Sequence, residues 1–174
     1  MKARLSTLAL LALCWAMTAV ADNVAPPAGA TLAAPKVPSA AEALAAWHEY
    51  RVEPLARLDK TPPFLDFIRD SGQVHIVLNN DLMAWMYQPM DNTVKAALYA
   101  SFLGGNMAAQ LAAKQSGDND DVAGMDAALD AYAAARKAHP DFQLPLFERL
   151  AKARGDNKLA EAVKDIESGA AAQP

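Results

Sequence analysis

Apolar residues recur every three or four positions from Ser39 onwards, which is the spacing of helices that bury one face. The longest such segment runs from Thr93 to about Gln115. The pattern predicts helices over the ranges 39–53, 61–71, 81–90, 93–115, 122–138, 141–153 and 157–167. We therefore expect an all-α compact bundle of about five to seven helices, arranged as helical hairpins.

One stretch, residues 73–78, carries the β-branched residues typical of a strand. No other segment offers a comparable pairing partner. Because a lone strand leaves its main-chain hydrogen bonds unpaired, we favour helix for 73–78 and keep strand as the alternative.

Several helix ends have recognisable signals. Ser39 and Glu42 form a capping-box pattern at the first helix. Thr61 is the expected N-cap of the second helix, with Pro62 at its first position, and Gly72 is the expected stop. Gly104 and Gly105 interrupt the longest helix, which is tolerated where a neighbouring helix crosses closely or the helix bends.

The first 21 residues have the three parts of a secretory signal peptide. Lys2 and Arg4 give a positive start, an apolar run follows to about residue 17, and Ala19 and Ala21 form a small-x-small cleavage site. An uncleaved membrane anchor is disfavoured, since the run is shorter than the roughly 20 apolar residues that span a bilayer. A lipoprotein acylated at Cys14 is disfavoured because Leu13 is not small.

The rest of the chain divides by composition. We expect a disordered Ala/Pro-rich leader over 22–38, a single helical domain over 39–168 and a disordered tail over 169–174. No later apolar run is long enough to span a membrane.

Between Ala108 and Pro140 the chain resembles part of a tetratricopeptide repeat. Residues 128–135, followed by Pro140, are similar to the second helix of that repeat, and residues 114–118 are similar to its inter-helix turn. Residues 154–156 before Ala160 and Ala162 are a weaker echo. The loop 117–128 is longer than the repeat allows, and the first helix lacks the aromatic and glycine signals. The resemblance indicates helical hairpins and does not assign the family.

Cleavage after Ala21 changes the chemistry that is available. It removes Cys14, the only cysteine, so no disulfide or thiol chemistry remains. It also lowers the basic count from 16 to 14 against 20 acidic residues, a net charge of −6 with histidine neutral. This acidic balance argues against nucleic acid as a partner. No motif implies a cofactor.

The most distinctive cluster is Met83, Met86 and Met90, whose spacing places three thioethers on one face of the expected 81–90 helix. Thioethers are soft ligands suited to Cu(I), and His75 is the residue that would complete such a site. Trp85 would shield it. The alternative, which we favour, is core packing, because methionine fills irregular cores well.

Other candidate chemistry is weaker. The acidic loop 118–121 fails the EF-hand template. His48, His75 and His139 lack metal-site spacing. The carboxylates Asp66, Asp70, Glu148 and Glu161 are candidates for acid–base work only if folding brings them together.

These observations predict an exported, periplasmic or secreted helical protein that is not an enzyme. The expected role is a protein-interaction or envelope-assembly module, with another envelope protein or a peptide as partner. A soft-metal or small-ligand binder is the alternative, and a carboxylate-based enzyme is the third reading.

Overall fold

The computed structural model describes residues 36–113 and 119–169. These ranges contain six α-helices, two 3-10 helices and no strand. In chain order they are α1 (Ala40–Tyr50), η1 (Leu58–Lys60), α2 (Pro62–Asp70), η2 (Ala84–Tyr87), α3 (Asn92–Ala113), α4 (Asp121–Ala138), α5 (Pro145–Gly155) and α6 (Leu159–Glu167). The all-α prediction is confirmed. The predicted signal peptide with Ala19 and Ala21, the leader up to residue 35 and the tail from 170 lie outside the described residues.

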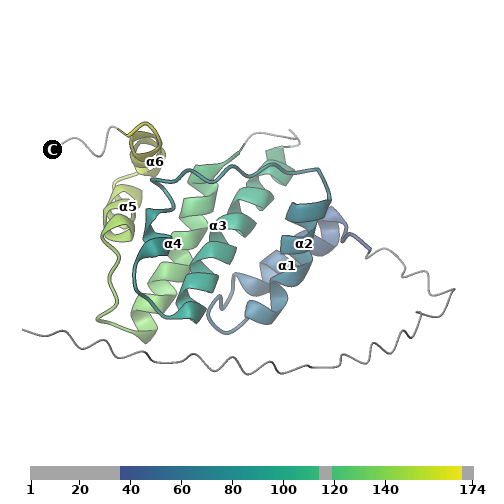
Figure 1. The fold of residues 1–174 in the computed structure, drawn as a ribbon, viewed down its shortest axis with the longest axis horizontal. Coiled ribbons are helices and arrows are strands. Elements are labelled where there is room, and N and C mark those ends of the chain that lie inside the picture. Colours follow the sequence, from purple (N-terminus) through teal and green to yellow (C-terminus); the bar gives the residue numbers. More distant parts are fainter. Residues whose placement is uncertain (1–35, 114–118, 170–174) are drawn as a thin grey trace, which may run out of the picture. The chain divides into compact units, whose positions relative to one another are not determined.

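The helices pack as three consecutive pairs, α1 with α2, α3 with α4 and α5 with α6 (Figure 1). The central hairpin, α3 with α4, has the most extensive interhelical contact. The α1–α2 hairpin packs on α3, and the α5–α6 hairpin packs on α4. This arrangement confirms the predicted helical hairpins. Among the helices of the described ranges, none combines the length and hydropathy needed to cross a bilayer.

Two buried apolar clusters hold the hairpins together. One lies among α1, α2 and α3 and is rich in aromatic residues, namely Trp47, Tyr50, Phe64 and Phe67 with Met107. The other lies among α3, α4, α5 and α6 and also takes in side chains from the linker before α3, including Leu82, Met83 and Trp85. The α3–α4 hairpin is therefore held by apolar contacts on both of its sides, with the α1–α2 pair on one side and the α5–α6 pair on the other.

Glycines allow the closest helix contacts. A methyl group on Gly104 would lie 2.2 Å from the Trp47 ring, and one on Gly105 would lie 2.6 Å from the carbonyl oxygen of Ala123. On the facing helix, a methyl group on Gly124 would lie 2.8 Å from the Phe102 ring. The glycine pair in α3 therefore marks a close crossing, one of the two explanations that the sequence allowed.

The predicted caps have mixed outcomes. The Ser39–Glu42 capping box is present, with each residue bonding the main chain of the other. Gly72 follows α2 with a φ of +65°, as a helix stop requires. Thr61 is the N-cap residue of α2 and Pro62 begins the helix, as predicted, but the Thr61 hydroxyl makes no cap bond. It donates instead to the Leu58 carbonyl of the preceding 3-10 turn, at 2.8 Å.

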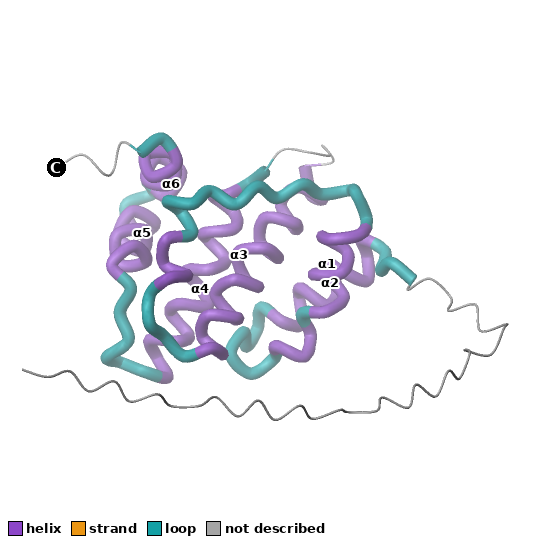
Figure 2. The backbone as a smooth tube through the Cα atoms, viewed as in Figure 1, coloured by secondary structure: helices purple, strands orange, loops and turns teal. Residues whose placement is uncertain are grey.

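The linker from Ser71 to Asp91 differs most from the sequence prediction (Figure 2, teal between α2 and α3). Residues 74–79 are neither helix nor paired strand, so the helix favoured for 73–78 is wrong. The expected 81–90 helix is also wrong, because a turn leads only into the short η2. The Asn79 side chain accepts hydrogen bonds from the Asp81 and Leu82 amides, which favours a turn over a helix start here. Pro89 then prevents extension beyond η2.

Candidate functional site

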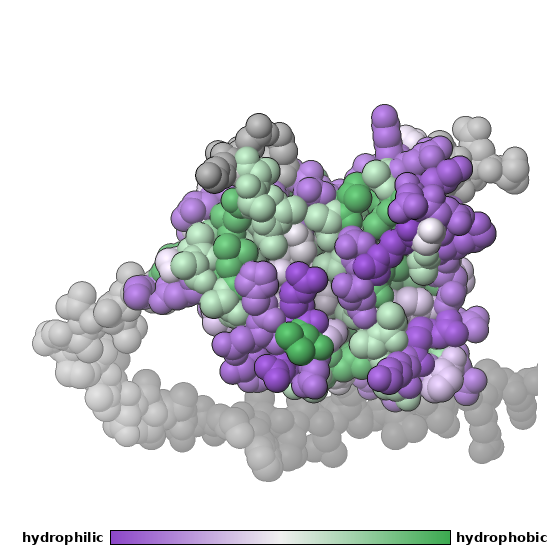
Figure 3. Space-filling model, turned by 180° about the vertical axis from the view of Figure 1, so that it is seen from behind, coloured by the Kyte–Doolittle hydropathy of each residue, from purple (hydrophilic) through white to green (hydrophobic). Residues whose placement is uncertain are grey.

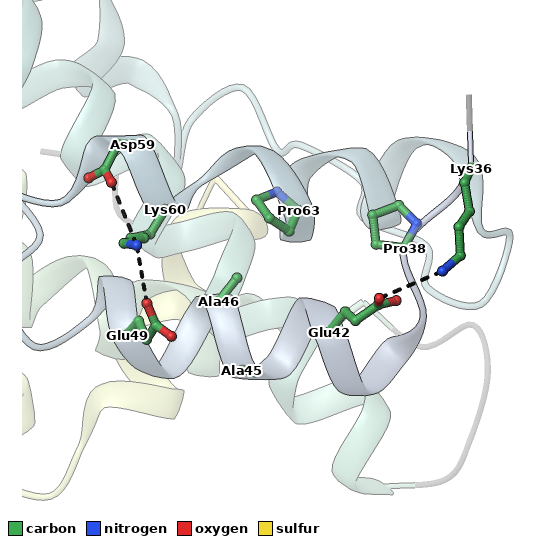
Figure 4. Close-up of a pocket in the computed structure, with 9 residues that line it drawn as sticks. All are labelled: Lys36, Pro38, Glu42, Ala45, Ala46, Glu49, Asp59, Lys60 and Pro63. Atoms are coloured by element: carbon green, nitrogen blue, oxygen red, sulfur yellow. Dashed lines mark ion pairs between the residues drawn. The ribbon is translucent and has the colours of Figure 1, made fainter. Parts of the chain in front are cut away.

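A groove of about 550 Å³ lies between α1 and the η1–α2 segment (Figure 4). Its floor on α1 is formed by Ala45 and Ala46, whose methyl groups leave space between the longer side chains of Glu42 and Glu49. Pro38 also lines this groove, and Pro63 lines its α2 side. The result is a hollow with an apolar floor.

Ion pairs stand at the two ends of this α1–α2 groove (Figure 4). At one end Lys60 lies 3.4 Å from Glu49 and 3.8 Å from Asp59. At the other end Lys36 lies 3.8 Å from Glu42. These pairs are exposed and contribute little to stability, so their charges remain available to a ligand.

A second groove, of about 750 Å³, lies between α4 and α5. The hydroxyl of Tyr132 donates to Glu148 at 2.6 Å, and Arg136 pairs with the same carboxylate. Burial, together with the bond to Glu148, raises the pKa of Tyr132. Arg154 is held by Asp126 and Asp130, each at 2.8 Å. Arg136 and Arg154, the two arginines of the α4–α5 groove, are thus each paired with a carboxylate of the chain.

A polar network connects the linker to the central hairpin. The side chain of Gln110, in α3, accepts from the His75 amide and donates to the His75 carbonyl, both at 2.9 Å. The side chain of Asn119, just before α4, makes the same pair of bonds to Val77, both at 3.2 Å. These two amides take the place of a neighbouring strand, which is how an extended segment persists without one.

Asn106 is the centre of this network and has no solvent exposure. Its amide nitrogen donates to Asn119 at 2.8 Å and, more weakly, to Asp121 at 3.4 Å. Its oxygen accepts from the Gln110 side chain at 2.7 Å and from the Asp120 main chain at 3.1 Å. Asn106 therefore fixes both of the amides that hold the linker.

A pair of carboxyl groups adjoins this network. Asp121, in the first turn of α4, is buried, and its carboxyl group meets that of Glu167 at the end of α6. Partial burial, with the hydrogen bond to Asp121 and its negative charge, raises the pKa of Glu167 to about 7. Glu167 therefore keeps its proton to a higher pH than an ordinary glutamate does.

The methionine cluster lies in and around the core. Met83 is 5% exposed, and Met86 and Met90 pack partly buried against the same apolar cluster. They do not share a helical face, because Met90 lies beyond η2. The His75 side chain is exposed. The Trp85 ring is buried edge-on against Phe147 with the centroids 5.5 Å apart. Metal binding by these residues remains a prediction from the sequence.

Of the four carboxylates singled out in the sequence, Asp66 and Asp70 meet at one arginine, whereas Glu148 and Glu161 lie elsewhere. Asp66 and Asp70 both pair with Arg69 on α2. Glu148 belongs to the α4–α5 groove, and Glu161 is exposed on α6. In the part of the chain that the structure describes, no three His, Cys, Asp or Glu side chains lie close enough to hold a metal ion.

Sequence reasoning missed the polar residues that matter most here. Asn106 and Gln110 fall within the predicted helix 93–115, and polar residues four apart on its buried face are a usable signal. The Asp121–Glu167 pair had no such signal, because its members lie far apart in the sequence.

The chain has no detected relative that would assign these features. Comparison with protein-family models, with curated proteins and with solved structures finds no match.

Proposed function

We propose that this chain is an exported helical protein that binds a segment of another envelope protein in the α1–α2 groove. The observation that supports this most directly is the groove itself, an apolar floor of alanine and proline between two ion pairs. Seen from behind, apolar residues gather over the α1–α2 side, whereas the α5–α6 side is mostly hydrophilic (Figure 3). Apolar surface rimmed by charges is typical of protein-binding sites.

The groove suits a partner segment in which one apolar side chain is flanked by polar residues. The alanine floor accommodates the apolar group, and the desolvated floor supplies the favourable free energy. Lys60 and Glu49 offer charges of both signs at one end, which orient a partner more than they add affinity. The proposed role is therefore binding, not catalysis.

Photo-crosslinking tests this role. A photoreactive residue is introduced at Ala45, which is exposed within the groove, and as a control at Ala160, an exposed alanine on α6. In cells that export the protein, we expect a specific crosslinked product from position 45 and none from position 160. The N-terminus of the isolated protein should be Asp22. Equal labelling at the two positions would count against the groove, and an unprocessed N-terminus would count against cleavage after Ala21.

A further inference from the structure

The extended segment Val74–Leu78 has two main-chain edges with different surroundings. On one edge, the amide and carbonyl of His75 are bound by Gln110, and those of Val77 are bound by Asn119. Residues two apart in an extended chain point their main-chain groups in the same direction. This edge is therefore satisfied by the protein itself.

The other edge belongs to the residues between. The main-chain groups of Ile76 and Leu78 point away from Gln110 and Asn119 because neighbouring residues alternate. Over residues 36–113 and 119–169, no hydrogen bond joins the amide or carbonyl of Ile76 or Leu78 to another group. The segment is thus equivalent to the edge strand of a sheet.

This edge lacks the features that usually prevent pairing. Proteins protect edge strands with lysine, proline or a bulge. Residues 73–80 contain no proline and no acidic, lysine or arginine side chain. Val77 is 54% exposed and Leu78 is 42% exposed. An incoming chain therefore meets apolar side chains beside open hydrogen-bonding groups.

The segment is also held in place before any partner arrives. Gln110 and Asn119 are themselves fixed by Asn106, which is fully buried. Val74 is buried in the α1–α2–α3 cluster, which anchors one end. A binding surface that is already ordered loses less conformational entropy on association.

We propose that Ile76 and Leu78 bind the main chain of an extended segment from another polypeptide, which adds to this edge as a β-strand. Only an extended chain presents its own amides and carbonyls at the matching spacing, which identifies the occupant's conformation. We expect it to carry β-branched or apolar residues opposite Val77 and to be neutral or basic, since the exposed Asp81 follows shortly after Leu78. The inference rests on the proposed protein-binding role but uses a surface outside the α1–α2 groove.

Peptide selection with amide hydrogen exchange tests this proposal. Random peptides of about ten residues, the upper range of strand length, are displayed on phage and selected on the exported protein. Exchange at individual amides is then followed by NMR with a selected synthetic peptide. We expect the peptide to slow exchange at Ile76 and Leu78, while His75 and Val77 are slow with and without it.

Two variants at Leu78 separate the contribution of its main-chain hydrogen bond to peptide binding from that of its side chain. Leu78→Pro removes the outward amide hydrogen, whereas Leu78→Ala shortens the side chain and keeps that hydrogen. We expect Leu78→Pro to weaken peptide binding about tenfold relative to Leu78→Ala, since it loses one hydrogen bond and leaves a partner carbonyl unpaired. Circular dichroism and thermal unfolding show whether both variants are folded, and the exchange data on the unmodified chain do not depend on either.

The results distinguish this proposal from the groove. Selected peptides that are lost with Ala45→Arg, but bind Leu78→Pro and Leu78→Ala equally, would support the groove and overturn strand addition. Loss with Leu78→Pro alone would support strand addition without the groove. Failure to select any peptide would also overturn strand addition by another polypeptide. Self-association that protects the Ile76 and Leu78 amides without peptide would overturn it too, because the occupant would then be a second copy of this chain.

Discussion

At the scale of single residues, Asn106 joins the linker to the start of α4. It is fully buried and bonds to Gln110, Asn119, Asp120 and Asp121. Removal of such a residue leaves several buried donors and acceptors unpaired, which costs more than the bonds themselves contribute. The extended linker depends on this one amide.

We expect Asn106→Ala to lower the free energy of unfolding by about 3 kcal/mol, because the buried partners of Asn106 lose their bonds. Urea denaturation measures this change. The control is Asn80→Ala, which truncates an exposed asparagine of the linker and should alter stability by less than about 0.5 kcal/mol. The amides of His75 and Val77 should also exchange faster in Asn106→Ala. Equal stability of the two variants would contradict the assigned role.

Local sequence could not reveal these contacts. The lack of a partner strand favours helix over 73–78 only if another strand is the sole source of hydrogen bonds for an extended segment. The actual partners, Gln110 and Asn119, are side chains 35 and 42 residues further along the chain. The hydropathy pattern shows Asn106 and Gln110 as polar positions in an apolar helix, but it does not identify their partners.

At the scale of elements, long helices were predictable and short connections were not. The apolar period identified α3 and α4, and Ser39 located the start of α1, because these signals are local. The linker residues Leu82, Met83 and Trp85 are buried by packing of a turn on the core. The spacing of these buried residues therefore matches the apolar spacing of a helix, although only the short η2 forms here.

The crossing of α1 and α3 gives a prediction at this scale. In an open helix, alanine is more favourable than glycine by roughly 1 kcal/mol, but a methyl group at Gly104 meets the buried Trp47 ring. We therefore expect Gly104→Ala to reduce the free energy of unfolding by about 1–3 kcal/mol through overpacking. Thermal and urea unfolding provide the measurement.

Gly155, the last residue of α5, provides a matched control for Gly104. A methyl group there has no heavy atom within 4 Å. Gly155→Ala should therefore leave stability unchanged or slightly increased. A stable Gly104→Ala variant would show that the α1–α3 crossing can widen at little cost.

At the scale of the whole molecule, the C-terminal helix is connected to the central hairpin by a titratable contact. The end of α6 meets the start of α4 through Glu167 and Asp121, next to the network around Asn106. The sequence predicted both helices but not this pair, because helix periodicity does not determine which surfaces of separate hairpins meet. The grooves were unpredictable for the same reason.

This contact makes stability depend on pH in a defined direction. The pKa of Glu167 is about 7 in the folded protein, against an ordinary value of 4.5. Between these values the folded state retains a proton that the unfolded state has released. The free energy of unfolding contributed by this pair therefore falls as pH rises from about 4.5 to about 7, and is constant above that range.

Glu167→Gln tests this effect, because glutamine resembles the protonated carboxyl group and does not titrate. We expect the variant to match the unmodified protein near pH 4.5 and to exceed it in stability at about pH 8, as measured by urea denaturation across this range. Asp165→Asn, which removes an exposed carboxylate from the same helix, should keep the original pH dependence. The three proteins differ only at positions 165 and 167, so the contributions of all other groups cancel in the comparison. Parallel pH profiles for Glu167→Gln and the unmodified protein would show that Glu167 does not retain its proton in the folded state.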